Sequence, residues 1–231
     1  MSQAHAAAVG LTAAASVGLA ALVRARPASG PSVRAGLAGF LLAGAAGYVA
    51  AEWRLGVLSP WDFLPLHLCD FAIFAAAFAL LTHRRGAVEL VWFWALTGTL
   101  LAIVTPAVSG SFPDWRWILY FAMHGGVIAA AVVIVVGCGI RPRKDAPWRV
   151  FGWTALYAAV IAIVDFATGA NFLWLRAKPL QPTPLDWLGP WPIYILAAGA
   201  IGLVGFHLLA LPFRTSRSRI ASNNVIHYNS K

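Results

Sequence analysis

The sequence has few charged residues for its length. Of its 231 residues, 11% are Asp, Glu, Lys or Arg, about half the usual share of a soluble domain. A soluble globule of this size could not cover its surface with so few charges. Hydrophobic residues make up 60% of the chain and the mean hydropathy is +0.74. Together with repeated apolar runs of roughly 20 residues, these values place most of the chain in a lipid bilayer. This composition excludes a free cytoplasmic enzyme, a secreted disulfide scaffold and a disordered regulator.

Cysteine and acidic residues are also scarce. The two cysteines, Cys69 and Cys138, fall near opposite ends of their apolar runs, too far apart in depth to form a disulfide. The chain has 8 Asp and Glu against 17 Lys and Arg, which gives a net charge of +9. In a soluble protein this balance would suggest nucleic acid. Here we expect it to reflect membrane topology and contact with anionic membrane lipids, with no nucleic-acid partner.

Apolar stretches separated by charged or Pro/Gly-rich breaks predict seven transmembrane helices. Each is long enough to cross a hydrocarbon core of about 30 Å. We therefore predict an all-α polytopic membrane helix bundle, formed by one domain over residues 1–212 and followed by a mobile, basic cytoplasmic tail over 213–231. The predicted helices lie near residues 4–23, 35–53, 63–82, 87–105, 116–138, 149–168 and 191–212.

The distribution of Lys and Arg predicts the orientation of the bundle. Thirteen of them fall in alternate connecting segments and the tail, whereas the opposite segments hold only four. By the positive-inside rule, the N-terminus is outside and the C-terminus is cytoplasmic. No Lys or Arg precedes the first apolar run and three arginines follow it, which argues against a cleaved signal peptide. We expect a multi-pass membrane protein. The four outer residues are Arg54, Arg116, Arg176 and Lys178.

Polar residues within the predicted helices are costly and are candidates for function. Most of them fall in the outer halves of the helices, whereas the inner halves offer mainly Glu89 and His207. A polar, water-accessible pocket that opens outward would spare these groups from contact with lipid. The outer set comprises Glu52, His67, Cys69, Asp70, Thr105, His124 and Asp165, and the outer loops add Asp114, Asn171, Lys178 and Asp186.

A group of these residues has the types needed for acyl transfer. His67 and Asp70 are three residues apart, so the carboxylate can orient the imidazole, and His124 lies at a similar depth. Cys69 points away from His67 on the same helix, so a nucleophilic Cys69 would need a base from another helix, with His124 as the obvious candidate. We predict His67, Cys69, Asp70 and His124 as catalytic residues. The predicted substrate-binding residues are Glu52, Asp165, Asn171 and Lys178, of which the last two could also stabilise developing negative charge.

Other interpretations of the same residues stay open. His67, Asp70 and His124 could form a two-histidine, one-carboxylate metal site, although no HxxxH or HExxH motif is present. His67 and His124 could ligate a haem, and the sequence identifies no cofactor. The polar residues could instead form a structural hydrogen-bond network. A transporter or binding protein without chemistry is the main alternative function, with Glu89 and His207 as inner residues of its path.

The segment 171–191 is rich in proline. Its prolines fix the backbone without regular structure, so it is either a rigid outer lid over the mouth of the bundle or an ordinary connection. These prolines are Pro179, Pro182, Pro184 and Pro190.

Several of these segments resemble the signature blocks of the YwaF-like family of bacterial integral membrane proteins. The resemblance runs from about residue 50 to residue 210 and implies a multi-pass bundle in a bacterial plasma (inner) membrane. One departure is Phe172, where the family pattern leads us to expect tyrosine. More distantly, the chain is similar to a eukaryotic transmembrane acyltransferase family that remodels ether phospholipids through a membrane-embedded cysteine and histidine, which implies lipid acyl chemistry. The blocks are LPLHLCD at 64–70, TGTLLAIVTP at 97–106, FPDW at 112–115, HG at 124–125, NFLWL followed by KP at 171–179, and LGPWPIY at 188–194.

Overall fold

The computed structural model describes residues 2–56, 64–106, 108, 110–180 and 182–214. Within these residues the regular structure is entirely helical. The predicted cytoplasmic tail lies outside the described residues from position 215 onward. The α-helices are α1 (Gln3–Ala25), α2 (Gly30–Arg54), α3 (Leu68–Thr82), α4 (Arg85–Trp94), α5 (Leu100–Val104), α6 (Trp115–Val132), α7 (Ala146–Thr168) and α8 (Ile193–Arg214). Shorter elements are the 3₁₀-helices η1 (Pro27–Ser29), η4 (Phe172–Trp174) and η5 (Pro184–Leu188), and the π-helices η2 (Ala95–Thr99) and η3 (Val133–Gly137).

Six of the described helices are long and apolar enough to cross a membrane. The prediction of an all-α, multi-pass membrane protein is thereby confirmed for the described residues. The third predicted span is shorter than expected, because α3 begins only at Leu68 and has 15 residues, or about 22 Å of helix. Pro65 and the extended backbone of His67 precede it. The six helices are Gln3–Ala25, Pro27–Arg54, Arg85–Val104, Trp115–Gly137, Ala146–Thr168 and Ile193–Arg214.

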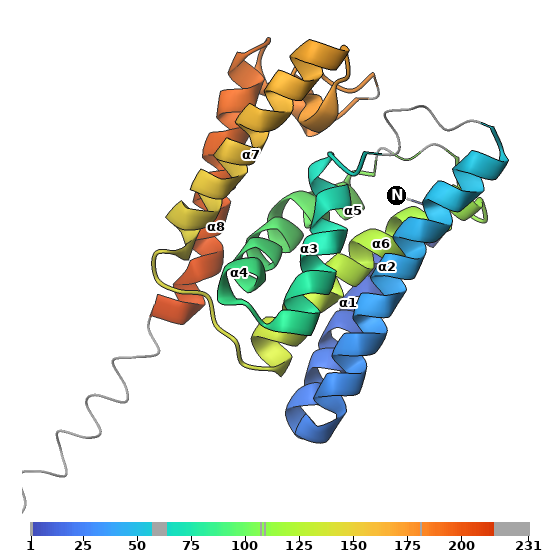
Figure 1. Cartoon of the computed structure of the whole chain (residues 1–231), viewed down its shortest axis with the longest axis vertical. Helices are drawn as coiled ribbons and strands as arrows, with labels where there is room; N and C mark the ends of the chain where they lie inside the picture. The colour runs from blue at the N-terminus through green and yellow to red at the C-terminus, as the bar shows by residue number, and fades with distance from the viewer. Residues whose placement is uncertain (1, 57–63, 107, 109, 181, 215–231) are drawn as a thin grey trace, which may run out of the picture.

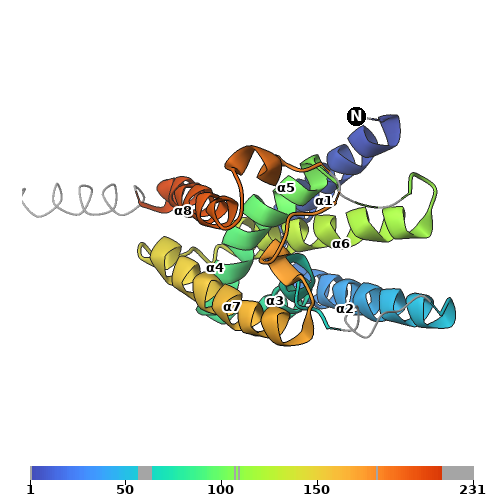
Figure 2. The same cartoon turned by 90° about the horizontal axis from the view of Figure 1, so that it is seen from above.

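Two helices form the centre of the bundle. In the most apolar stretch of each spanning helix, 67% of the residues are buried for the helix made of α6 and η3, and 50% for the helix made of α4, η2 and α5. The share is 17% in each of the other four. Figure 1 shows α3, α4 and α5 in the middle, with α1 and α2 on one side and α7 and α8 on the other. Seen from above, α1 and α2 diverge on either side of α6 (Figure 2), and both pack against it. The outer helices therefore present most of their surface away from the core.

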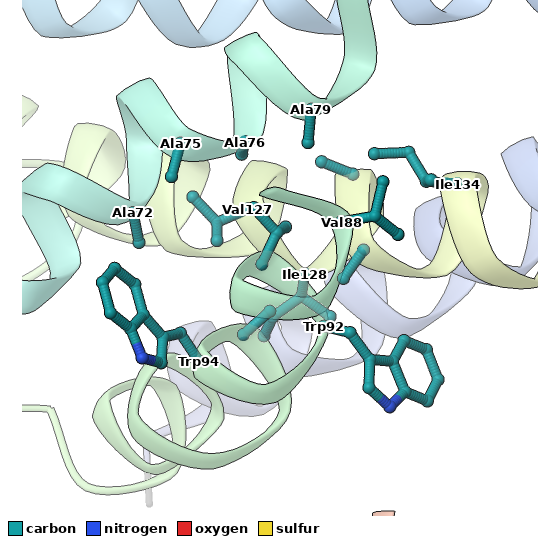
Figure 3. Close-up of a cluster of buried hydrophobic side chains, with 14 of the residues drawn as sticks. Ala72, Ala75, Ala76, Ala79, Val88, Trp92, Trp94, Val127, Ile128 and Ile134 are labelled. Atoms are coloured by element: carbon teal, nitrogen blue, oxygen red, sulfur yellow. The ribbon is translucent and has the colours of Figure 1, made fainter. Parts of the chain in front are cut away.

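Small side chains let α3 pack closely on the centre of the bundle. Alanines one turn apart point from α3 toward valines and isoleucines of α4 and α6, and tryptophans of α4 border the same cluster (Figure 3). This packing fixes the start of α3 relative to the two buried helices. The labelled side chains are Ala72, Ala75, Ala76, Ala79, Val88, Trp92, Trp94, Val127, Ile128 and Ile134.

A buried ion pair fastens α4 to the segment that leads into α7. Glu89 is 1% exposed, and its carboxylate accepts bonds from the Arg143 guanidinium at 2.8 and 2.7 Å and from the Arg143 backbone N–H at 2.9 Å. Buried charges of this kind are stable only when they are paired and hydrogen-bonded. Glu89 therefore acts as the structural partner of Arg143. From the sequence alone it was a candidate inner residue of a transport path.

Candidate functional site

Three of the predicted catalytic residues lie at the start of α3. His67 is the residue that precedes the helix, with an extended backbone, and Cys69 and Asp70 lie in its first turn. All three side chains are partly buried. In Figure 1 this end of α3 lies on the same side of the molecule as the loops that join α7 to α8.

The proline-rich segment contacts this cluster. The His67 ring lies 5.4 Å from the ring of Phe172 and 5.3 Å from that of Trp174, centroid to centroid. Both aromatic residues belong to η4, and the Tyr194 hydroxyl, from α8, donates a hydrogen bond to the Trp174 carbonyl. The segment therefore packs against His67 as a lid over the bundle mouth would.

Cys69 contacts a residue that sequence reasoning did not select. The side chains of Thr99 and Asp70 lie near the Cys69 thiol. Thr99 is 2% exposed and is the last residue of the π-helix η2. Single π-helical turns occur often at functional sites, because the extra residue shifts the side chains that follow it. A local distortion of this kind has no signal in the sequence.

Tyr157 of α7 is a second residue that the sequence did not reveal. Its hydroxyl donates to the Leu66 carbonyl at 3.0 Å, and its ring lies 5.1 Å from that of Phe71. Asp70 acts electrostatically on both Tyr157 and His67. Tyr157 therefore joins α7 to the backbone just before α3 and borders the cluster.

His124 is held on α6 in a defined orientation. Its Nδ1 lies 2.8 Å from the Tyr120 carbonyl oxygen, and its ring stacks 4.1 Å from that of Tyr120. Because a carbonyl oxygen only accepts, Nδ1 carries a proton, and in the neutral ring the lone pair is then on Nε2. The Tyr120 hydroxyl in turn donates to the Ala102 carbonyl of α5 at 2.9 Å.

The α4–α5 helix connects the two halves of the predicted catalytic group. Thr99, which contacts Cys69, and Ala102, which binds Tyr120, are three residues apart across the junction of η2 and α5. Residues three apart lie on the same face about one turn from each other. Cys69 and Tyr120, the hydrogen-bond partner of His124, thus adjoin this helix about one turn apart.

Two of the predicted substrate-binding residues are buried acids with protein partners. Glu52 of α2 is 6% exposed and forms a two-point ion pair with Arg116 of α6, at 2.7 and 3.3 Å. Asp165 of α7 is fully buried, and its Oδ1 accepts from the Phe172 backbone N–H at 2.9 Å. Asp165 therefore supports the residue that contacts His67, and its Oδ2 has no partner among the described residues.

The other two predicted substrate-binding residues lie within the proline-rich segment. The Asn171 side chain accepts from the backbone N–H groups of Arg176 and Ala177 and donates to the Ala177 carbonyl. The Lys178 ammonium lies 3.9 Å from a carboxylate oxygen of Asp186 and 5.4 Å from the centre of the Tyr194 ring. Asn171 thus shapes the loop, whereas Lys178 is held only by longer contacts.

The alternative sites are less well supported by the geometry. Across the described part of the chain, no group of three His, Cys, Asp or Glu side chains is close enough to hold a metal ion. The set of His67, Asp70 and His124 is therefore not assembled as a metal site. His207, the second inner residue of a transport path, binds the Leu203 carbonyl through Nδ1 at 2.9 Å and packs on Trp148.

Comparison with known families identifies the family of this chain. The model of the TMEM164 family matches residues 1–210, nearly the whole described structure. The chain belongs to the TMEM164 family. An uncharacterized protein of Treponema pallidum (strain Nichols) is 27% identical to this TMEM164-family chain over 158 residues, which cover 67% of this chain and 63% of that protein's length. No solved structure matches the chain. The resemblance to YwaF-like proteins stays an interpretation beside this family membership.

Proposed function

We propose that this TMEM164-family protein is a membrane-embedded enzyme that transfers or hydrolyses the acyl group of a lipid ester, with Cys69 as nucleophile and His124 as base. The observation that carries the proposal is the orientation of His124. Its Nδ1 is bound to the Tyr120 carbonyl, which leaves Nε2 available as a base, and Tyr120 contacts the α4–α5 helix about one turn from Thr99, the neighbour of Cys69.

The reaction follows from these positions. As the sulfur of Cys69 attacks, its proton leaves and His124 Nε2 accepts it. The sulfur forms a bond to the ester carbonyl carbon, the bond from that carbon to the alkoxy oxygen breaks, and the leaving oxygen takes the proton from His124. A second lipid hydroxyl or water then attacks the thioester, with His124 again as base, and restores the thiol.

The lid supplies the remaining parts of the proposed site. Phe172 and Trp174 cover His67 and limit the access of water. Lys178, held only by longer contacts in the lid, is a candidate to stabilise the negative charge on the carbonyl oxygen. In this proposal Glu52, Asp165 and Asn171 act on substrate binding indirectly, because their hydrogen bonds hold the helices and the loop around the site in place.

The proposal includes the membrane topology. In this proposal seven helices cross the membrane over residues 1–212, with α3 as a short span. The site opens to the outer side of a bacterial plasma membrane. The Lys and Arg distribution supports this orientation. The bacterial relative in Treponema pallidum fits a bacterial origin.

The nucleophile can be tested with an activated fatty-acid ester. We expect the purified full-length protein to release para-nitrophenol from a para-nitrophenyl fatty-acid ester and to gain the mass of the acyl group on Cys69. Cys69→Ala should abolish the covalent adduct, because the nucleophilic sulfur is gone. The measurements are absorbance of the released phenol and peptide mass spectrometry.

Cys138→Ala is the matched control, since Cys138 is the other cysteine of the chain and follows η3 at the far end of α6. It should retain both the adduct and the rate of release. Equal acylation of Cys69→Ala and the wild type, or an adduct that disappears only in Cys138→Ala, would exclude Cys69 as the nucleophile.

A further inference from the structure

A cavity lined by basic as well as apolar side chains lies at the opposite end of the bundle from Cys69. It has a volume of about 380 Å³ and is bounded by the end of α1, the start of α2, the end of α3 and the end of η3. This is the end of the bundle that the Lys and Arg distribution predicts to be cytoplasmic. Its lining includes Arg24, Arg34, His83 and Cys138, and it contains no acidic residue.

The two arginines of this cavity keep their charge free for a ligand. Among the described residues, neither guanidinium lies within 4.0 Å of a carboxylate, whereas Arg116 and Arg143 each have a Glu partner. Arg34 donates to the Leu80 carbonyl at 2.9 Å and to the His83 ring, and Arg24 makes a long contact of 3.4 Å to the Val136 carbonyl. Two unneutralised guanidinium groups in one cavity are suited to a phosphate group.

His83 positions Arg34 rather than adding a third charge. Because Arg34 donates to Nε2 of His83, that nitrogen must be unprotonated and the ring neutral. Burial, and then the charge of Arg34, lower the pKa of His83 below its usual range, which agrees with a neutral ring. The cavity therefore carries the charge of its two arginines.

An apolar groove follows this cavity along the helices. It has a volume of about 580 Å³ and is lined by α1, α2 and α6 together with Phe112. Small residues of α1, such as Ala8 and Ala15, leave room between Leu11 of the same helix and Phe40 of α2. Because α1 and α2 diverge on either side of α6 (Figure 2), the groove lies in the opening between them.

The cavity and the groove follow one another along the same two helices, and together they are called the path below. On α1, Leu19 lines the groove and Val23 lines the cavity, and on α2 the corresponding residues are Leu37 and Arg34. Residues three or four apart on a helix share a face, so each pair places the two spaces on adjacent turns. The order is that of a phospholipid in a leaflet, with its phosphate at the ends of the helices and its acyl chain along them.

We propose that this path is a binding site for an anionic phospholipid of the inner leaflet, separate from the Cys69 site, with the lipid phosphate on Arg24 and Arg34 and an acyl chain in the groove between α1 and α2. Basic cavities between membrane helices on the cytoplasmic side are a known means of recognising anionic headgroups. The groove supplies the apolar contact that a water-soluble phosphate could not use.

Native mass spectrometry of the full-length protein in detergent tests the site. We expect phosphatidylglycerol to bind more tightly than phosphatidylcholine, and glycerol phosphate to bind far more weakly than either, because it lacks acyl chains. Removing one arginine with Arg24→Gln or Arg34→Gln should weaken phosphatidylglycerol binding about tenfold, as expected for the loss of a charge-assisted hydrogen bond. Arg24 is the safer variant, because it is exposed and makes only the long carbonyl contact.

Two matched controls separate the site from general surface effects. Arg85→Gln removes an exposed arginine at the same end of the bundle and should leave the affinity unchanged. Ala15→Phe fills the groove and should weaken lipid binding, whereas Ala14→Phe, which does not line the groove, should have no effect.

Three results would overturn the proposal. The first is an equal loss of affinity in Arg85→Gln, which would indicate nonspecific attraction to the basic surface. The second is binding of glycerol phosphate as tight as that of phosphatidylglycerol, which would indicate a soluble phosphate ligand. The third is a dimer in the same mass spectra that Ala15→Phe disrupts without any effect of lipid, which would show that the groove packs against a second copy.

Discussion

Replacing Glu89 by alanine should lower the free energy of unfolding by about 3 kcal/mol, because it leaves the Arg143 guanidinium and backbone N–H without their partner. This is the lower end of the range for breaking a buried pair, since the Arg143 side chain is 33% exposed and can recover some contact with water. The loss should appear as a shift of the unfolding midpoint in mixed micelles of mild detergent and sodium dodecyl sulfate.

A double-mutant cycle assigns the effect to the pair. Glu89→Ala and Arg143→Ala together should cost clearly less than the sum of the two single changes, because the second change removes the unpaired charge that the first one creates. Asp145→Ala is the matched control: Asp145 pairs with Arg149 at 3.7 Å in the same region, with both side chains about half exposed, and exposed pairs of this kind contribute about 0.5 kcal/mol. Additive single effects would contradict the structural role of Glu89.

The sequence predicted the membrane bundle because hydropathy and helix length depend only on local composition. Six of the seven predicted spans correspond to helices of spanning length, with ends shifted by at most three residues except at the second, where α2 begins five residues earlier than predicted. The third differs because Pro65 and the extended backbone at His67 delay the start of α3 to Leu68. A run of apolar residues cannot show this, since Leu64 and Leu66 suit an extended segment as well as a helix.

The sequence predicted which residues form the candidate site but not which residues contact them. Intramembrane polar residues identified His67, Cys69, Asp70 and His124, and the structure places the first three together at the start of α3. Pairings between distant parts of the chain were not visible in the sequence. Glu52 with Arg116, and Thr99 with Cys69, both depend on how helices pack and, in the second case, on a π-helical turn.

Replacing His124 by alanine should slow acyl transfer to Cys69 by a factor of about 10² to 10⁴, the usual contribution of a general base. The physical reason is that the Cys69 proton has no other acceptor in the proposed reaction. The rate of para-nitrophenol release by the full-length protein measures the effect. The loss should diminish as the pH rises toward the range where thiols ionise without help, because hydroxide then replaces the base.

His207 offers a matched control for this substitution. It lies on α8 and repeats the local arrangement of His124, with Nδ1 bound to the carbonyl of the residue four positions earlier, at 2.9 Å against 2.8 Å. His207→Ala removes the same ring and the same type of hydrogen bond. Any loss of stability that follows from removing a histidine from a helix should therefore appear in this variant too. A rate that falls equally in both variants would indicate a loss of folding, and a rate unchanged in His124→Ala would require another base. A loss confined to His124→Ala that recovers at high pH would distinguish a base from a residue that only packs, because a packing defect does not titrate with the thiol.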